Sequence, residues 1–260
     1  MKIRGERECK SCGARWSYYE TGETACPECG SLRSVAVEDE RRRHTDSPAE
    51  IDLGPYRSSL ADGAAIVDVA DGVERDCRAY LRKRGFIRGG ELLPLDDTFL
   101  AVSELRAAIA DYSRDERVGV AGSHPAARGT SSLGVDRGDF GDEDAERYLL
   151  SLIRGAEDGE RPEPADVADS LTAARGLAYA SAVEDYREDV STYLEDEPDE
   201  GAKRILERVR DQQKRLHALG GDVEPEIAEE LIDACRALER YLNGESESLA
   251  EATAHLDTLA

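Results

Sequence analysis

Residues 9–30 read CKSCGARWSYYETGETACPECG, and this stretch decides the fold of the amino-terminal part of the chain. It contains two matching units, Cys9-Lys10-Ser11-Cys12-Gly13 and Cys26-Pro27-Glu28-Cys29-Gly30, with 13 residues between Cys12 and Cys26. Two residues between paired cysteines let a tight turn direct both sulfurs at one ion, and the glycine after each pair permits the positive φ that closes such a turn. The spacing therefore predicts a metal site with four thiolate ligands, Cys9, Cys12, Cys26 and Cys29.

The residues around the two cysteine units predict a small β-sheet. The aromatic stretch 14–19 is typical of a strand, Thr21-Gly22-Glu23 of a turn, and Leu32 to Val37 of a further short strand. Two cysteine turns at the ends of a small sheet are the zinc-ribbon arrangement. A module of about 35 residues is too small to be stabilised by an apolar core alone, so we expect a metal ion to hold residues 1–37 together.

The predicted donor set also indicates the kind of metal. A tetrahedral site with four sulfur ligands has no open position, so it is structural rather than catalytic. We expect one structural Zn²⁺, with iron in a rubredoxin-type centre as the alternative, because both metals use four thiolates. Binding deprotonates the thiols, so the folding of this module should depend on metal and on pH.

The four cysteines and their glycines resemble the zinc ribbons of archaeal and eukaryotic transcription machinery. The whole chain resembles an uncharacterised haloarchaeal family with such a ribbon at its amino terminus. Members of the ribbon class contact proteins or nucleic acids. The resemblance therefore implies an interaction or adaptor protein, associated with transcription or RNA handling, and does not specify a target.

The charge of the chain is strongly negative. Its 260 residues include 34 Lys and Arg against 57 Asp and Glu, a formal net charge of −23, and the cations are 29 Arg and only 5 Lys. A surface rich in carboxylates and poor in Lys resembles proteins of salt-accumulating microbes, in which salt screens the self-repulsion. We interpret the charge as halophilic adaptation. A nucleic-acid mimic or a cation-binding surface is the alternative, but there is no long run of like charge to favour it.

The ribbon differs from the rest of the chain in charge. Residues 1–34 contain six cations and five anions, so the remaining residues carry −24. Bases could stack on Trp16, Tyr18 and Tyr19 in this near-neutral patch, unless these aromatic side chains form the ribbon's own core. Counterion-release binding weakens at high salt. We therefore expect a protein partner, with nucleic acid as the alternative.

After the ribbon, the sequence predicts a charged linker and then a mainly α-helical domain. Residues 38–46 contain no apolar side chain and predict a solvated hinge. Residues 47–260 predict a helical bundle or helical hairpins with about six to eight helices. Ser47-Pro48-Ala49-Glu50 has the spacing of a capping box, residues 97–112 predict a helix, and residues 86–93 predict a small hairpin. The apolar positions that mark helical faces are Ile66, Val69, Val73, Cys77, Tyr80 and Leu81; Tyr148, Leu149, Leu152 and Ile153; Val183, Tyr186, Val190 and Tyr193; Leu206, Val209, Leu216 and Leu219; and Ile227, Leu231, Ala234, Leu238 and Tyr241.

The helical part contains two isolated cysteines and two candidate binding features. Cys77 and Cys235 are isolated on apolar faces, so we expect them in the core. Cations between Arg75 and Arg88 either stabilise the carboxyl end of a helix through its dipole or form a docking site for an acidic partner or RNA. Residues 118–141 are rich in glycine and predict a flexible loop, with an anion-binding cradle around Arg128 as the alternative. The cationic cluster consists of Arg75, Arg78, Arg82, Lys83, Arg84 and Arg88.

The sequence offers little support for an enzyme. The chain has 4 His and contains no H-E-x-x-H motif, no nucleophile elbow and no P-loop. Glu-x-x-His pairs of a di-iron bundle are absent as well. An enzyme or electron carrier, using a rubredoxin-like iron site or the glycine-rich loop, remains the second functional hypothesis. Neither a secretory signal nor a membrane-spanning apolar segment is evident, so we expect a cytoplasmic protein with no membrane partner.

Overall fold

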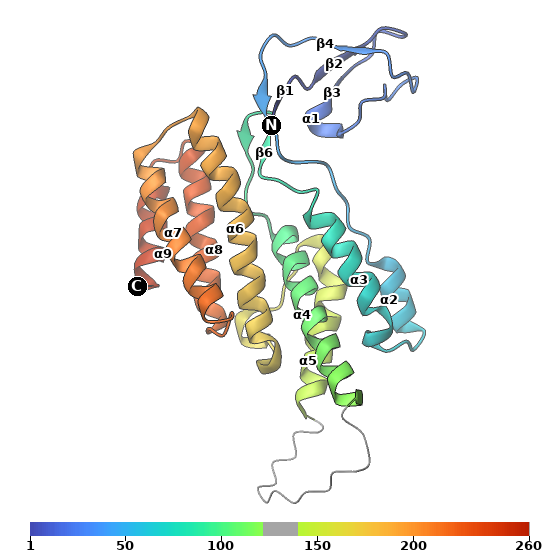
Figure 1. Ribbon diagram of the computed structural model, residues 1–260, viewed down its shortest axis with the longest axis vertical. Coiled ribbons are helices and arrows are strands. Elements are labelled where there is room, and N and C mark those ends of the chain that lie inside the picture. The colour runs from blue at the N-terminus through green and yellow to red at the C-terminus, as the bar shows by residue number, and fades with distance from the viewer. Residues whose placement is uncertain (122–139, 260) are drawn as a thin grey trace, which may run out of the picture.

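The computed structural model describes residues 1–121 and 140–259, with side chains up to residue 114 and from residue 143. A small region with short strands lies at one end of the molecule, next to a larger set of helices (Figure 1). We call residues 1–37 the cysteine module and the helices that follow the helical body. The fold class is as predicted, a small β-module followed by a mainly α-helical part.

The cysteine module is built on a three-stranded antiparallel sheet with the strand order β3-β2-β4. Glu8 in the central strand lies opposite Arg15 on one side and Val35 on the other. The prediction that residues 14–19 form one strand is wrong at its end, because Tyr18–Thr21 form a single helical turn that is closed by Gly22 at φ 65°. The elements of the module are β1 Lys2–Ile3, β2 Glu6–Cys9, β3 Arg15–Ser17, α1 Tyr18–Thr21 and β4 Ser34–Ala36.

The segment 38–46 is not the solvated hinge that the sequence predicts. Strand β5 (Arg42–Arg43) pairs antiparallel with β1, and Asp46 is only 1% exposed. The carboxylate of Asp46 accepts hydrogen bonds from Arg84 Nε at 3.1 Å and Arg88 Nε at 3.0 Å. Residues 39–42 remain exposed, but the end of the segment is buried at His44 and Asp46 because the partners of Asp46 come from elsewhere in the chain.

The hairpin predicted at residues 86–93 is confirmed. Strands β6 (Ile87–Arg88) and β7 (Glu91–Leu92) pair antiparallel across Gly89 and Gly90, which have φ of 58° and 91°. Two consecutive positive φ angles are typical of a two-residue hairpin turn, and glycine adopts them without strain. The hairpin lies beside the β1–β5 pair, between the cysteine module and the helices (Figure 1).

The helical body contains eight α-helices within the described residues, in agreement with the prediction. The capping box predicted at residues 47–50 is wrong, because the amide of Ser47 donates instead to the carbonyl of Lys83 at 2.9 Å, and the first helix begins at Gly54 with Pro55 in its first turn. The helices are α2 Gly54–Ala61, α3 Ile66–Leu81, α4 Asp97–Ala121, α5 Phe140–Gly155, α6 Thr172–Asp196, α7 Glu200–Ala218, α8 Pro225–Leu242 and α9 Ser248–Thr258.

The helices form two groups, α2–α5 and α6–α9, that share one continuous apolar core (Figure 1). Most of the predicted face positions lie in or against this core, but Leu219 is 48% exposed because α7 ends one residue before it. Cys77 and Cys235 are fully buried, as predicted, and burial raises the pKa of each thiol to about 12. None of the helices, over the residues that can be described, is long and apolar enough to cross a lipid bilayer.

Candidate metal centre

Each cysteine pair lies in a tight turn that is built by the same backbone hydrogen bonds. The amide of the first cysteine donates to the carbonyl five residues later, over 2.8 Å for Cys9 and 3.0 Å for Cys26. The amides of Gly13 and Gly30 donate back to the carbonyls of these two cysteines, and both glycines have a positive φ, 79° and 69°. The predicted role of the glycines is therefore confirmed, since other residues would be strained there.

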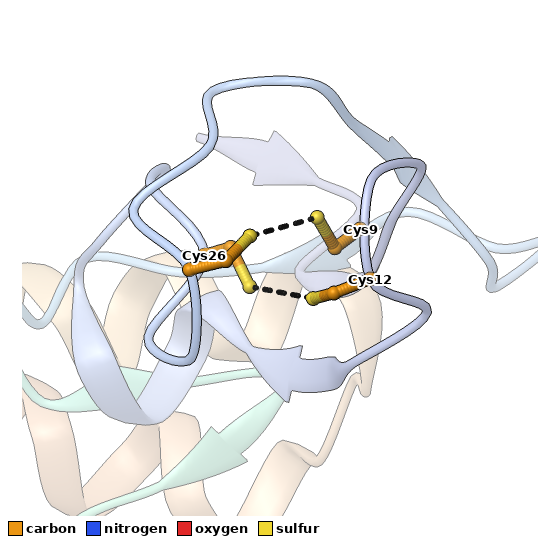
Figure 2. Close-up of side chains that lie close together, drawn as sticks. Cys9, Cys12 and Cys26 are labelled. Atoms are coloured by element: carbon orange, nitrogen blue, oxygen red, sulfur yellow. Dashed lines mark hydrogen bonds between the residues drawn. The ribbon is translucent and has the colours of Figure 1, made fainter.

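The four cysteine sulfurs converge on one point. The Sγ atoms of Cys9 and Cys29 are 3.7 Å apart and those of Cys12 and Cys26 are 3.6 Å apart, and all four lie within 4.8 Å of one another. Figure 2 shows the two turns facing each other, with the labelled sulfurs directed into the space between them. Four sulfurs at about 2.3 Å from one ion would lie about 3.8 Å apart at the corners of a tetrahedron. The donor set therefore fits a tetrahedral metal ion.

The two sides of this site differ in exposure. Cys9 and Cys26 are buried against the indole of Trp16, whose Nε1 donates to the carbonyl of Glu23 at 2.9 Å. Cys12 and Cys29 are exposed. One half of the donor set therefore forms the small core of the module, and the other half faces solvent.

The thiols do not ionise independently. Amide donors from Cys12 and Ser11 hold the pKa of Cys9 near 6, well below its usual value. The amide of Ala14 acts in the same direction on Cys12, but the sulfurs of Cys29 and of the other two cysteines outweigh it and raise the pKa of Cys12 to about 12. Successive deprotonation is thus opposed by like charge. A divalent cation would remove this repulsion and release protons.

Two aromatic side chains of the module, Trp16 and Tyr19, are buried in packing contacts. Trp16 belongs to the core beside the cysteines, and the ring of Tyr19 is buried with its centroid 5.2 Å from that of His44. The Tyr19 hydroxyl shares its one proton between two acceptors, the carbonyl of Ile3 at 2.9 Å and the carboxylate of Glu38 at 2.8 Å. The core interpretation is supported for Trp16 and Tyr19, which are buried, whereas Tyr18 is half-buried.

Ion pairs fasten the cysteine module to the end of α6. Asp196 accepts from Lys2 Nζ at 2.7 Å and from Arg43 Nε at 3.0 Å, and Arg43 also donates to Glu195 at 3.0 Å. The Arg43 guanidinium, followed by the Lys2 ammonium, lowers the pKa of Asp196 to about 2. Because these groups are partly exposed, salt should weaken the contact.

The predicted Arg75–Arg88 cluster does not form one basic surface. Arg84 and Arg88 turn inward to Asp46, while Arg75 pairs with its neighbour Asp76. Arg78 pairs with Glu74 and lies in the last turn of α3, where the helix dipole favours a cation. Arg84 and Arg88 therefore stabilise the junction between the cysteine module and the helical body through Asp46.

The helical body contains one segment that the structure largely leaves undescribed and one buried charged pair. The glycine-rich segment 118–141 falls largely outside the described residues, except that residues 118–121 belong to α4 and 140–141 to α5. Glu104 and Arg175 form a buried charged pair that the sequence does not predict. Charged residues in a helical pattern are normally interpreted as surface positions, so the sequence holds no signal that would have found this pair.

A family model matches residues 1–123 and 130–256. The chain belongs to DUF7117, a family of unknown function. The match to the DUF7117 model extends over both the cysteine module and the helical body of this chain. No curated protein and no solved structure matches the chain. Within the described part of this DUF7117 chain, the four cysteines form the only group of three or more side chains able to share a metal ion.

Proposed function

We propose that the chain is a zinc-binding interaction protein with one structural Zn²⁺ held by Cys9, Cys12, Cys26 and Cys29. The observation that carries this proposal is the convergence of four sulfurs at the spacing of a tetrahedral site. Four protein ligands leave no position for a substrate or an activated water, so the ion would stabilise the two turns and take no part in chemistry.

The identity of the metal is tested by purifying the full chain and measuring metal content together with visible absorption. We expect a colourless protein with about one zinc ion per chain. Zinc and iron fit the same four sulfurs, so geometry does not separate them. A red preparation loaded with iron would contradict the zinc assignment and would support an electron carrier instead.

The surface proposed for interaction is the outer strand of the cysteine module. Leu32 is 75% exposed, and Val35 and Val37 in and beside β4 are 40% and 43% exposed. Large apolar side chains are seldom left in solvent next to one another in a chain with 35% charged residues. Apolar contacts are not screened by salt, which favours a protein partner over nucleic acid in a salt-rich cytoplasm.

The interaction is tested by capturing partners from native lysate in molar salt with two forms of the chain. The test variant combines Leu32→Ser, Val35→Thr and Val37→Thr, and the control combines Val67→Thr with Leu219→Ser, which are exposed apolar positions of the helical body. We expect the test variant alone to lose its partner while it keeps its metal. An unchanged partner list would remove the outer strand from the proposal.

We further propose that the partner belongs to the transcription or RNA-handling machinery of a salt-accumulating cell. The resemblance of the cysteine pattern to transcription-factor ribbons supports the first part, and the excess of 29 Arg over 5 Lys at a net charge of −23 supports the second. The identities of the captured proteins test the first part. The second predicts that the folded state is more stable in molar KCl than at low salt.

A further inference from the structure

A cavity of about 510 Å³ lies between the end of α6 and α7, and none of the four cysteines lines it. Leu194 and Leu206, which belong to the apolar core, contribute to its floor together with Pro198. Arg187 and Arg210 line its polar side. Pockets of this size with an apolar floor and a few convergent polar groups are typical of small-molecule sites.

Two guanidinium groups in this cavity have no anionic partner among the described residues. Neither Arg187 nor Arg210 forms an ion pair there, although most of the arginines discussed above do. The Nε of Arg187 is shielded from solvent and has no hydrogen-bond acceptor in the part of the chain that the structure describes. Because solvent does not reach this Nε, a ligand in the cavity would bind the terminal nitrogens of Arg187 instead.

The remaining charges of the cavity do not satisfy these two arginines. Glu195 already binds Arg43, and Lys203 is paired with Glu200. Glu207 also lines the cavity, but its carboxylate is more than 4 Å from both guanidinium groups, since neither forms a salt bridge with it. Two uncommitted cations therefore face one uncommitted anion, in a chain whose net charge is −23.

We propose that this cavity binds a small organic anion, a carboxylate on an apolar chain or ring. The carboxylate would accept hydrogen bonds from Arg187 and Arg210, whose planar groups suit two-point contact with carboxylates. The apolar body would cover the floor at Leu194 and Leu206. The inference does not depend on the metal centre or on the proposed interaction role.

The first experiment titrates octanoate into the full metal-loaded chain by calorimetry, with octan-1-ol and acetate as matched probes. Octan-1-ol keeps the apolar body without the charge, and acetate keeps the charge without the body. We expect each to bind at least about tenfold more weakly than octanoate. Equal binding of octanoate and octan-1-ol, or no octanoate binding at millimolar concentrations, would overturn the proposal.

The second experiment tests the arginines with Arg187→Gln and Arg210→Gln, using Arg208→Gln as the control. Arg208 lies on the same helix as Arg210 but pairs with Asp257 and does not line the cavity. We expect octanoate affinity to fall about tenfold in each test variant and to stay unchanged in the control. Arg210 is exposed, so its variant decides the question even if Arg187→Gln folds poorly. Wild-type affinity in Arg210→Gln would contradict the proposal.

Discussion

The two regions of this molecule are stabilised in different ways. The apolar cluster of the cysteine module consists of Cys9, Trp16 and Cys26 with Ala14 against it, whereas the helical body has a continuous core that runs through α3 to α9. Such a small cluster cannot offset the conformational entropy of the module, and a metal ion can. The body buries enough apolar surface to need no ion. We therefore expect the cysteine module, and not the helical body, to depend on a metal ion for its folding.

The largest effect is expected when the metal is removed with a chelator or by Cys12→Ala, which tests whether only the cysteine module depends on it. Binding of a structural zinc ion contributes about 10–16 kcal/mol in small modules, so the cysteine module should unfold while the helices persist. The chain has 1 Trp, which lies in the module and reports on it alone. We expect Trp16 fluorescence to shift to that of an exposed indole, with little change in far-ultraviolet circular dichroism.

The matched control is the same substitution in the other region, Cys77→Ala. This thiol is buried in the core of α3, so its loss should cost the body about 1–2 kcal/mol and leave metal content unchanged. Loss of metal in Cys77→Ala would show that the two regions do not fold as separate units. An intact module in Cys12→Ala would show that the module does not depend on the metal ion.

A smaller effect is expected from the buried charges of the helical body. Arg175 donates to the carboxylate of Glu104 at 3.3 Å and to the carbonyl of Pro162 at 3.0 Å, and also pairs with Glu229. Arg175→Met would leave a buried carboxylate without its cation and should cost about 3–5 kcal/mol in urea unfolding. Metal content should not change.

The pH dependence of that variant follows from Glu104. Burial raises the pKa of Glu104, and Arg175 opposes this effect by favouring the ionised form. Without Arg175, the buried carboxylate of Glu104 destabilises the fold only while it is ionised. The difference in the free energy of unfolding between wild type and variant should therefore shrink as pH falls and Glu104 takes up a proton. A difference that does not depend on pH would assign the loss to packing instead.

The smallest predicted effect concerns the start of α7. Asp199 accepts a hydrogen bond from the amide of Ala202 at 2.7 Å and another from the hydroxyl of Tyr241 at 2.9 Å, and the Ala202 amide is the larger cause of its lowered pKa. Asp199→Ala should therefore cost about 1 kcal/mol at neutral pH in urea unfolding.

Because the pKa of Asp199 is lower in the folded state, its contribution is present above the unfolded pKa of about 4 and is lost as pH falls through the folded value. Asn caps a helix about as well as Asp. Asp199→Asn should thus retain most of the stability and lose this pH dependence. A full loss in Asp199→Asn would mean that the charge, rather than the cap, stabilises the helix.

Local patterns were sufficient for the parts of the fold that depend on nearby residues. The turns closed by Gly13 and Gly30, the hairpin at Gly89-Gly90 and the buried face of α3 all follow from spacing and backbone preference. The segment 38–50 could not be predicted in this way. Its conformation depends on partners far along the chain, such as β1 for Arg42–Arg43 and the Lys83 carbonyl for Ser47.

The sequence by itself determined which four cysteines form the cluster, the mainly helical character of the described residues after position 54 and the unequal charge of the two regions, because short spacings, apolar periodicity and residue counts encode them. Only the tertiary structure decided which charges are buried in pairs and which are left without a partner. A charged side chain looks the same in the sequence whether it faces solvent, Asp46 or the cavity at Arg187, since burial is set by the packing of distant elements.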